Sequence, residues 1–188
     1  MIRLEYFDQS NFEQLMGWVN TEELLTNWAG SLFSFPLTKE SMEWYLQDTN
    51  DLENSDAFLY SVIEEETGDV IGHISLGGVS RKNRSARISR VLIGSPQHKG
   101  KGYCSQMMKA VLKIGFEQLK LHRISLGVYT QNSAALHCYL SAGFKVEGTM
   151  REVLLQGNEW WSLIEMAILE DEWRTIVAAE QQVAMKAV

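Results

Sequence analysis

The stretch Ser95–Met107, SPQHKGKGYCSQM, holds the residues whose types and spacing best fit anion-binding chemistry. Gly100 and Gly102 stand between an apolar run and the start of a helical pattern. Glycine lets a backbone approach its ligand closely, and the free amides at a helix N-terminus bind anions with the helix dipole behind them. Lys99 and Lys101 add positive charge to the same loop. The loop is therefore a candidate phosphate site, although a plain glycine turn would have a similar composition.

Two common glycine motifs for phosphate do not fit this loop. A Walker A loop needs four residues between its glycines and Ser or Thr after the lysine, whereas five residues separate Gly94 from Gly100 and Gly102 follows Lys101. A Rossmann fingerprint needs a third glycine where Ser105 stands, and an acid at the end of a second strand. The sequence therefore disfavours a nucleotide hydrolase and a dinucleotide-binding domain.

The charge distribution supports an anion site near the loop. Residues 70–116 contain nine Lys and Arg and no Asp or Glu, while the rest of the chain has eight basic and 24 acidic residues. A solvated basic face would give the same pattern. The formal net charge of −7 argues against general nucleic-acid binding. The acidic remainder would suit a cationic second ligand.

The hydrophobic patterning must supply elements that position this loop. Helical spacing is expected over 10–20 and 38–49, with a Ser10–Glu13 capping box and Thr38 as N-cap. Segments rich in β-formers predict a hairpin and two further strands, and helices are predicted after Gly102 and between Asn132 and Gly143. The predicted strands cover residues 57–65, 69–78, 86–94 and 123–129, followed by a hairpin over 145–169 and a C-terminal helix over about 170–186.

This order predicts an α+β (mixed α/β) fold, a single domain over 1–188 with a central, mostly antiparallel mixed sheet flanked by helices. The chain has no run of 18 apolar residues and no apolar leader at its N-terminus. Cys104 and Cys138 suggest neither a disulfide framework nor a metal site. We therefore expect a cytoplasmic protein with no bound metal, no membrane partner and no nucleic-acid partner.

Two motifs together carry a family resemblance. Gln97-His98-Lys99-Gly100-Lys101-Gly102 matches Q/R-x-x-G-x-G/A, and about 30 residues later NSAALHCYLSAGF matches N-x-x-[AS]-x-x-x-Y-x-x-x-G-F. In this context the chain resembles the GNAT superfamily of acyl-CoA-dependent N-acyltransferases. The resemblance covers roughly residues 70–169 and implies the acyl-CoA N-acyltransferase fold, with that segment as the CoA-binding core. The segments LHRISLGVYTQNSAA and GFKVEGTMREVLLQGNEW look most like the ribosomal-protein N-terminal acetyltransferase-like subgroup.

The resemblance implies roles for individual residues. The strand before the loop would hold the pantetheine arm, the loop amides would hold the pyrophosphate, and Asn132 would hydrogen-bond the pantetheine. Tyr139 would be the general acid that protonates the departing thiolate, although a core tyrosine would show the same helical spacing. Arg81, Lys82 and Arg84 are candidates for the 3′-phosphate. The expected cofactor-binding set is Val91, Leu92, Ile93, Lys99, Gly100, Lys101, Gly102, Tyr103 and Asn132.

The carboxylates that serve as general base in relatives have no counterpart in this chain. Relatives often carry a Glu on the strand before the loop or an Asp near position 162, but this chain has no carboxylate in ARISRVLIG and has Ser162. Glu165 on the last predicted strand, His73 and a water chain to Ser89 are the candidates, and we take Glu165 as the expected base. A covalent route through Cys104, at the start of a helix, is the alternative to direct transfer.

The implied activity is transfer of an acetyl group from acetyl-CoA to a primary amine by direct attack in a ternary complex. The acceptor is a small molecule or a protein N-terminus, and the sequence does not fix which. Tryptophans in the N-terminal helices and the last hairpin could line an acceptor groove or simply pack in the core. Edge strands and exposed aromatics favour a homodimer. A non-catalytic acyl-CoA-binding or sensing domain is the alternative function.

Overall fold

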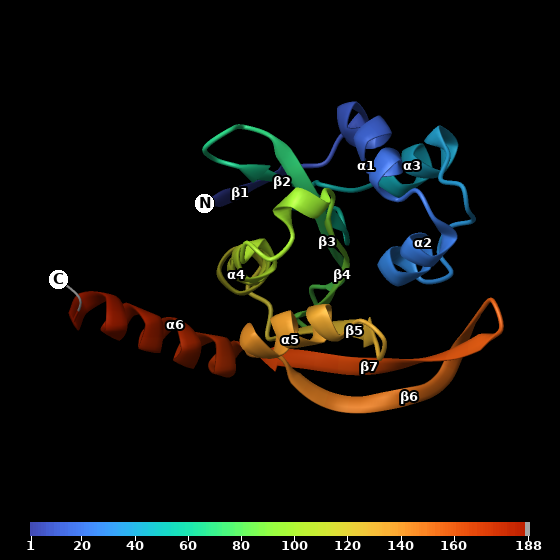
Figure 1. The fold of residues 1–188 in the computed structure, drawn as a ribbon. Coiled ribbons are helices and arrows are strands. Elements are labelled where there is room, and N and C mark those ends of the chain that lie inside the picture. The colour runs from blue at the N-terminus through green and yellow to red at the C-terminus, as the bar shows by residue number, and fades with distance from the viewer. Residues whose placement is uncertain (187–188) are drawn as a thin grey trace.

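A computed structural model describes residues 1–186, and the strands within that range form one sheet in the order β1-β2-β3-β4-β5-β7-β6 (Figure 1). β4 and β5 run parallel, and the other neighbouring pairs run antiparallel. The predicted α+β fold with a mostly antiparallel mixed sheet is therefore confirmed. The strands are β1 (Ile2–Tyr6), β2 (Phe58–Glu64), β3 (Val70–Ser80), β4 (Ser85–Ile93), β5 (Arg123–Tyr129), β6 (Lys145–Gln156) and β7 (Glu159–Leu169).

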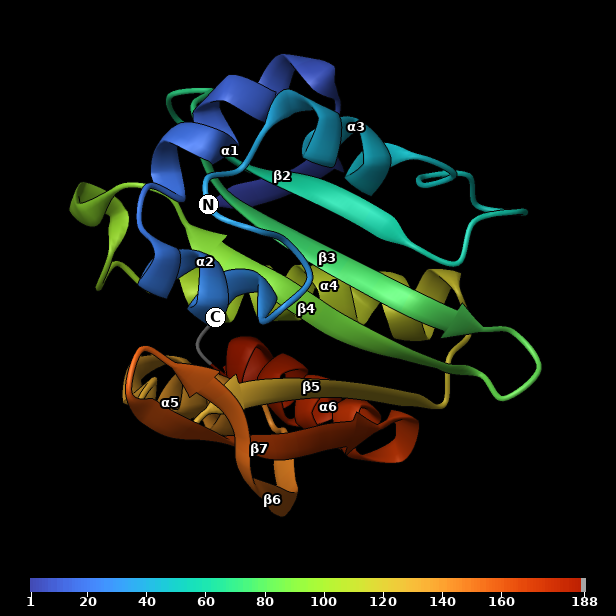
Figure 2. The ribbon, with the colours of Figure 1, turned by 90° about the vertical axis from the view of Figure 1, so that its right-hand side faces the viewer.

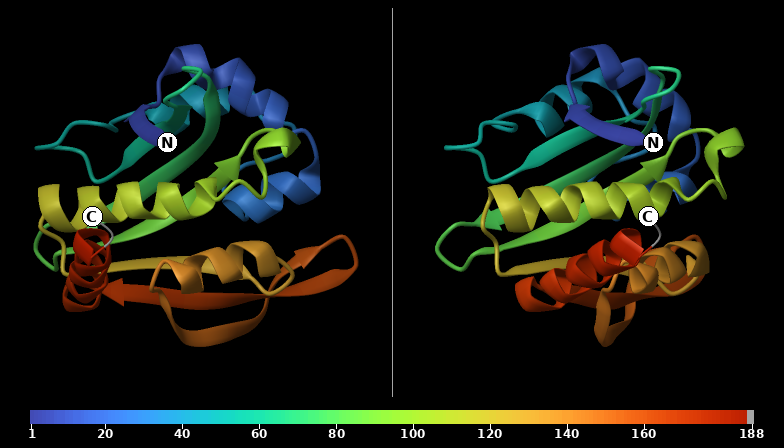
Figure 3. Two further views of the ribbon diagram at one scale, coloured as in Figure 1. Left: turned by 60° about the vertical axis from the view of Figure 1, so that its left-hand side comes forward. Right: turned by 90° about the vertical axis from the view of Figure 1, so that its left-hand side faces the viewer.

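Helices cover both faces of the sheet. The N-terminal helices lie on one face, which is turned toward the viewer in Figure 2. The later helices lie on the opposite face, which Figure 3 shows from the other side. The helices are α1 (Phe12–Trp18), α2 (Glu22–Ala29), α3 (Lys39–Leu46), α4 (Tyr103–Lys113), α5 (Ser133–Ser141) and α6 (Glu170–Lys186).

Each face of the sheet has its own hydrophobic core. The larger core joins the sheet to α4, whose Met107, Met108 and Val111 are fully buried at the spacing of one helical face. The smaller core lies under the N-terminal helices and includes Phe12 of α1 and Trp28 of α2. Because both faces are covered, the central strands β2 and β3 are buried along nearly their whole length.

β4 and β5 separate along their length, and this separation opens the sheet. They pair only at their beginnings, from Ser85 opposite Arg123 to Arg87 opposite Ser125. Figure 2 shows the two strands diverging toward the end where α2 and α5 lie. From Ile88 onward, the edge of β4 that faces β5 is therefore free of strand pairing and lines a gap between the two halves of the sheet.

Most of the predicted elements are present, with three differences in the first half. β1 was not predicted, although its Ile2 and Leu4 pack against the larger core. α2 was not predicted either, although its Trp28 is buried. The first cap is formed by Asp8, whose carboxylate accepts from the amide of Ser10 at 2.8 Å, so the predicted Ser10–Glu13 box is wrong. Thr38 caps α3 as predicted, and Ser41 completes the reciprocal pair in place of Glu or Gln. Within the described residues, no helix is long and apolar enough to cross a membrane.

Candidate active site

The glycine loop lies where β4 ends and α4 begins, beside the gap in the sheet. Gly100 and Gly102 have φ angles of +77° and +78°, which glycine adopts without strain, and Gly102 is the N-cap of α4. No side chain caps this helix. Its first amides are therefore available to an external anion, as expected of a phosphate-binding helix start.

One large cavity joins this loop to the gap between β4 and β5. It has a volume of about 710 Å³ and reaches from the loop past both strands to α5 on one side and α2 on the other. All nine expected cofactor-binding residues except Lys101 line it. The structure therefore gathers residues that lie up to 41 positions apart, from Val91 to Asn132, around a single space.

Asn132 and Tyr139 enter this cavity from α5. The side chain of Asn132 caps the helix by accepting from the amide of Ala135 at 3.1 Å, so the structural role is present whether or not it also binds a ligand. Tyr139 is only 6% exposed and packs near Phe144. Burial raises the pKa of its phenol to about 12, so the group stays protonated and can donate a hydrogen bond at any physiological pH.

The cavity contains no carboxylate among the residues that line it in the described chain. Glu165, the expected base, instead forms a two-pronged ion pair with Arg87, with oxygen–nitrogen distances of 2.7 and 2.8 Å. Both of its oxygens are therefore occupied, and the side chain does not line the cavity. This geometry disagrees with a base role for Glu165.

His73 is also poorly suited to act as a base. Its ring is 1% exposed, and burial together with the Arg90 charge lowers its pKa to about 3. Its Nε2 shares a hydrogen bond with the hydroxyl of Tyr45 at 3.0 Å. The ring thus belongs to the aromatic cluster under the N-terminal helices. Ser89 lines the cavity, but its hydroxyl already accepts from Arg90 Nη1 at 2.9 Å and shares a hydrogen bond with Ser75 Oγ at 3.0 Å.

The two cysteines form a disulfide between the start of α4 and α5, with Cα atoms 6.3 Å apart. Both cysteines line the large cavity. The expectation of two unpaired cysteines is therefore wrong, because the 34-residue separation in sequence conceals the packing of these two helices. With its sulfur bonded to Cys138, Cys104 offers no free thiolate for a covalent acyl route.

The basic residues expected at the 3′-phosphate are at the wrong end of β4. Arg81 donates to the carbonyls of Leu52 and Ser55, and Arg84 pairs with Glu170. β4 has nine residues, so at 3.3 Å per residue the turn before it lies roughly 30 Å from the glycine loop. Lys99 of the loop and His137 of α5 line the cavity instead.

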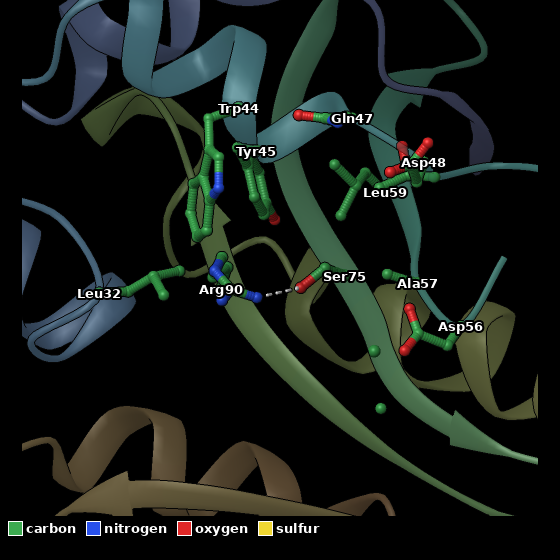
Figure 4. Close-up of a pocket in the computed structure, with 13 residues that line it drawn as sticks. Leu32, Trp44, Tyr45, Gln47, Asp48, Asp56, Ala57, Leu59, Ser75 and Arg90 are labelled. Carbon is green, nitrogen blue, oxygen red and sulfur yellow. Dashed lines mark hydrogen bonds between the residues drawn. The ribbon is translucent and has the colours of Figure 1, made fainter.

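A second, smaller cavity of about 460 Å³ opens on the other face of β4 (Figure 4). Trp44 and Tyr45 of α3 form its wall, and Arg90 belongs to the lining of both cavities. Among the predicted groove tryptophans, Trp44 is 57% exposed at this cavity, whereas Trp28 is buried and donates through Nε1 to the carbonyl of Arg90 at 2.9 Å. Arg87 and Arg90 of β4 also line the large cavity, and neither was predicted to do so.

Comparison with known proteins agrees with this geometry. An Acetyltransferase (GNAT) domain model matches residues 2–145. The uncharacterized N-acetyltransferase YnaD of Bacillus subtilis is 35% identical over 79 residues, which cover 42% of this chain and 46% of YnaD. A spermidine N(1)-acetyltransferase of Vibrio cholerae is 30% identical over 112 residues, covering 60% of this chain and 64% of the relative. The chain thus spans about half to two thirds of these relatives' lengths.

Solved structures share the whole fold. The crystal structure of spermidine N-acetyltransferase from Vibrio cholerae in complex with CoA and spermine superposes with a TM-score of 0.78 at 22% identity. The match covers 92% of this chain and 97% of that one. Since these relatives are named for a small amine, the ribosomal-protein subgroup suggested by the sequence is not supported. The family model, which matches well over half of the chain, shows that this protein belongs to the GNAT acetyltransferase family.

Proposed function

We propose that this protein transfers an acetyl group from acetyl-CoA to a primary amine, by direct attack of the amine on the thioester. The observation that carries the proposal is the large cavity, which contains the uncapped start of α4, the unpaired edge of β4 and the phenol of Tyr139 together. These supply in turn an anion site, a backbone edge for an extended arm and a proton donor.

The basic lining of the cavity suits the polyanionic end of acetyl-CoA. The amides of Lys99 to Tyr103 would receive the pyrophosphate, with the charge of Lys99 beside them. Tyr103 itself is anchored, because its hydroxyl donates to Glu64. The carbonyls and amides of Val91, Leu92 and Ile93 would pair with the amide groups of the pantetheine arm.

The transfer needs little from the protein beyond positioning and hydrogen bonding. The amine nitrogen forms a bond to the thioester carbon, the carbon–sulfur bond breaks, and the thiolate leaves as the amine loses a proton. Tyr139 is the proposed donor to the sulfur. Since no carboxylate lines the cavity in the described chain, the amine must arrive neutral or lose its proton to water.

The missing carboxylate also favours a second candidate, a domain that binds acyl-CoA without turning it over. Both candidates predict acetyl-CoA binding, so binding alone does not separate them. Incubation with acetyl-CoA and a panel of primary amines, followed by mass spectrometry of the amines and a colorimetric assay of free CoA, does separate them. An acetyltransferase releases CoA in step with acetylated product, whereas a sensor releases CoA with none of the amines or N-terminal peptides tested.

Self-association is a further part of the proposal. One solved relative is described as dodecameric. In this chain, the edge strand β6 is exposed along most of its length, including Val146, Val153 and Leu155, which are 46–53% exposed. An uncovered apolar edge strand favours pairing with a second chain. Light scattering after size exclusion is expected to give a mass at least twice 21.4 kDa, and a monomer would contradict this expectation.

A further inference from the structure

Arg90 carries a charge that the protein leaves without a partner. Its Nη1 donates to Ser89 Oγ at 2.9 Å and is 3.3 Å from Ser75 Oγ, and its Cζ lies 4.9 Å from the centre of the Tyr45 ring. Nε is buried and has no hydrogen-bond partner. No carboxylate lies within ion-pair distance among residues 1–186, in contrast to Arg87, which Glu165 neutralises. A half-buried cation is therefore held in place by neutral groups alone.

The unpartnered part of Arg90 has the shape of a carboxylate site. A guanidinium offers five N–H donors in a fixed fork, and Nη1 already serves the two serine hydroxyls. On the other edge of the fork, Nε is buried and has no hydrogen-bond partner among residues 1–186, while the guanidinium lies close enough to Tyr45 to act on its phenol. Two parallel N–H groups on such an edge match the two oxygens of a carboxylate. A ligand oxygen here would remove the cost of a buried, unpaired donor.

The position of Arg90 connects this anion site to the transfer chemistry. It is shared by the large cavity, where acetyl-CoA is expected, and by the smaller cavity lined by Trp44 and Tyr45. Figure 4 shows its guanidinium below these two rings and pointing toward Ser75. A carboxylate held on Arg90 therefore lies at the border between the two cavities. An amine only one carbon away from that carboxylate would be placed next to the unpaired edge of β4.

The far end of the smaller cavity has the opposite charge. Asp48 and Asp56 line that end, on the other side of Ser75 from Arg90 (Figure 4). Leu32 and Trp44 provide apolar contact near the Arg90 end. A polyamine, which is cationic along its whole length, would bring positive charge against Arg90, and like-charge contacts oppose binding. A ligand with an anionic head and a neutral or cationic tail fits both ends.

We propose that the acceptor is a free α-amino acid whose carboxylate binds the Nε–Nη2 edge of Arg90 and whose side chain extends past Trp44 toward Asp48 and Asp56. This inference rests on the proposed acetyltransferase function and narrows its acceptor from any primary amine to one with a neighbouring carboxylate. It also predicts an order among amino acids. Neutral and basic side chains are accepted, whereas the side-chain carboxylate of Asp or Glu is repelled by the acidic end.

The test compares acceptors that differ only in the carboxylate. The common L-amino acids are screened with acetyl-CoA, and kcat/KM for the best one is then compared with that for its α-carboxamide and for spermidine. We expect the free acid to exceed its amide by about 10- to 100-fold, the value of a hydrogen-bonded charge pair. Arg90→Gln should remove this preference by lowering kcat/KM for the acid to the level of the amide. Equal rates with acid and amide, or a preference for spermidine, would overturn the inference.

Control variants separate lost recognition from lost folding. Lys82→Gln makes the same charge change at an exposed turn and should leave the acid preference intact. Arg90→Lys keeps the charge but loses the two-pronged edge, so it should recover only part of the preference. For the Arg90 variants the readout is the ratio of the acid rate to the amide rate, because the amide does not use the carboxylate site, and Lys82→Gln should keep both rates within about threefold. A loss of both rates together would assign Arg90 to structure and overturn the inference.

A binding measurement distinguishes failure of the proposed acetyltransferase function from failure of the proposed Arg90 site. Binding of the amino acid is followed by ligand-observed NMR, which needs no turnover. If acetyl-CoA does not bind or react but the amino acid binds to wild type and not to Arg90→Gln, the transferase proposal fails and the carboxylate site stands. If acetyl-CoA binds and amines are acetylated while the carboxylate has no effect, the transferase proposal stands and the Arg90 site fails.

Discussion

Replacing Tyr139 with Phe tests what the buried phenol contributes to transfer. Burial raises the phenol's pKa to about 12, while a thiol of the cysteine type has a pKa of about 8.5. Complete proton transfer from this phenol to a thiolate would therefore be uphill by roughly 3.5 pKa units, or about 5 kcal/mol. A hydrogen bond from the neutral phenol to the developing thiolate avoids this cost. The structure thus favours donation of a hydrogen bond over early, full proton transfer.

The size of the expected effect follows from that distinction. A hydrogen bond to a charged group is worth about 1.5–3 kcal/mol, which corresponds to a fall in kcat of about 10- to 100-fold in Tyr139→Phe. The Kd for acetyl-CoA should change by less than about threefold, since the phenol acts on the leaving sulfur. Because burial keeps the phenol protonated, the pH profile of wild type should show no alkaline loss of activity from this group below about pH 11.

The assay is steady-state release of CoA with the best acceptor, together with calorimetric titration of acetyl-CoA for each protein. Phe removes only the hydroxyl and keeps the packing beside Phe144, so unfolding by urea should be nearly unchanged. An unchanged kcat would refute a role for Tyr139 in the reaction. A weakened Kd with unchanged kcat would place the phenol in binding. A fall beyond about 1,000-fold would refute the hydrogen-bond argument and favour full acid catalysis.

Three further predictions concern the loop, the ion pair and the buried histidine. Gly102→Ala places a side chain on a backbone with φ +78°, so it should raise the Kd for acetyl-CoA about tenfold in a calorimetric titration. The control Gly157→Ala causes similar strain at φ +59° on the distant β6–β7 turn and should leave that Kd unchanged. Glu165→Gln should lower kcat by less than about threefold. It should lower the free energy of unfolding in urea by about 1 kcal/mol, because it weakens a partly exposed ion pair with Arg87. A 100-fold loss of kcat in that variant would restore the base role. His73 has a folded pKa of about 3 against about 6.5 unfolded, so the unfolded state binds the proton and the free energy of unfolding should fall as pH drops from 6.5 toward 3. His73→Gln should flatten that fall by up to about 1.4 kcal/mol per pH unit, as measured by urea unfolding at pH 7 and pH 5, and identical slopes would contradict the assignment.

Local patterns in the sequence were enough to predict most of the fold. The β2–β3 hairpin combines two runs of β-formers with a turn between them, and Thr38 and Asn132 precede helical spacing as caps. β1 was missed because its five residues contain only two that reach the core. Its pairing with β2 depends on contacts across some 60 residues of chain, which short-range patterns do not reveal.

In the candidate site, too, features built from contiguous residues were predictable, and features that depend on contacts between distant residues were not. The loop was predictable because Gly100, Gly102 and the start of α4 are contiguous. The disulfide, the pairing of Glu165 with Arg87 and the isolation of Arg90 depend on side chains brought together by the folded sheet. In the sequence, Glu165 on the last strand is a reasonable candidate for the base. Only the structure shows that its carboxylate is paired with Arg87 of β4.

The most direct test of the loop and cavity is calorimetric titration of the purified protein with acetyl-CoA, with ATP as the control ligand. The arrangement of the uncapped start of α4 and the open edge of β4 predicts binding of acetyl-CoA at a Kd of about 1 μM, near −8 kcal/mol, and no measurable binding of ATP. Absence of acetyl-CoA binding, or equal binding of ATP, would contradict the assignment of this cavity to acetyl-CoA.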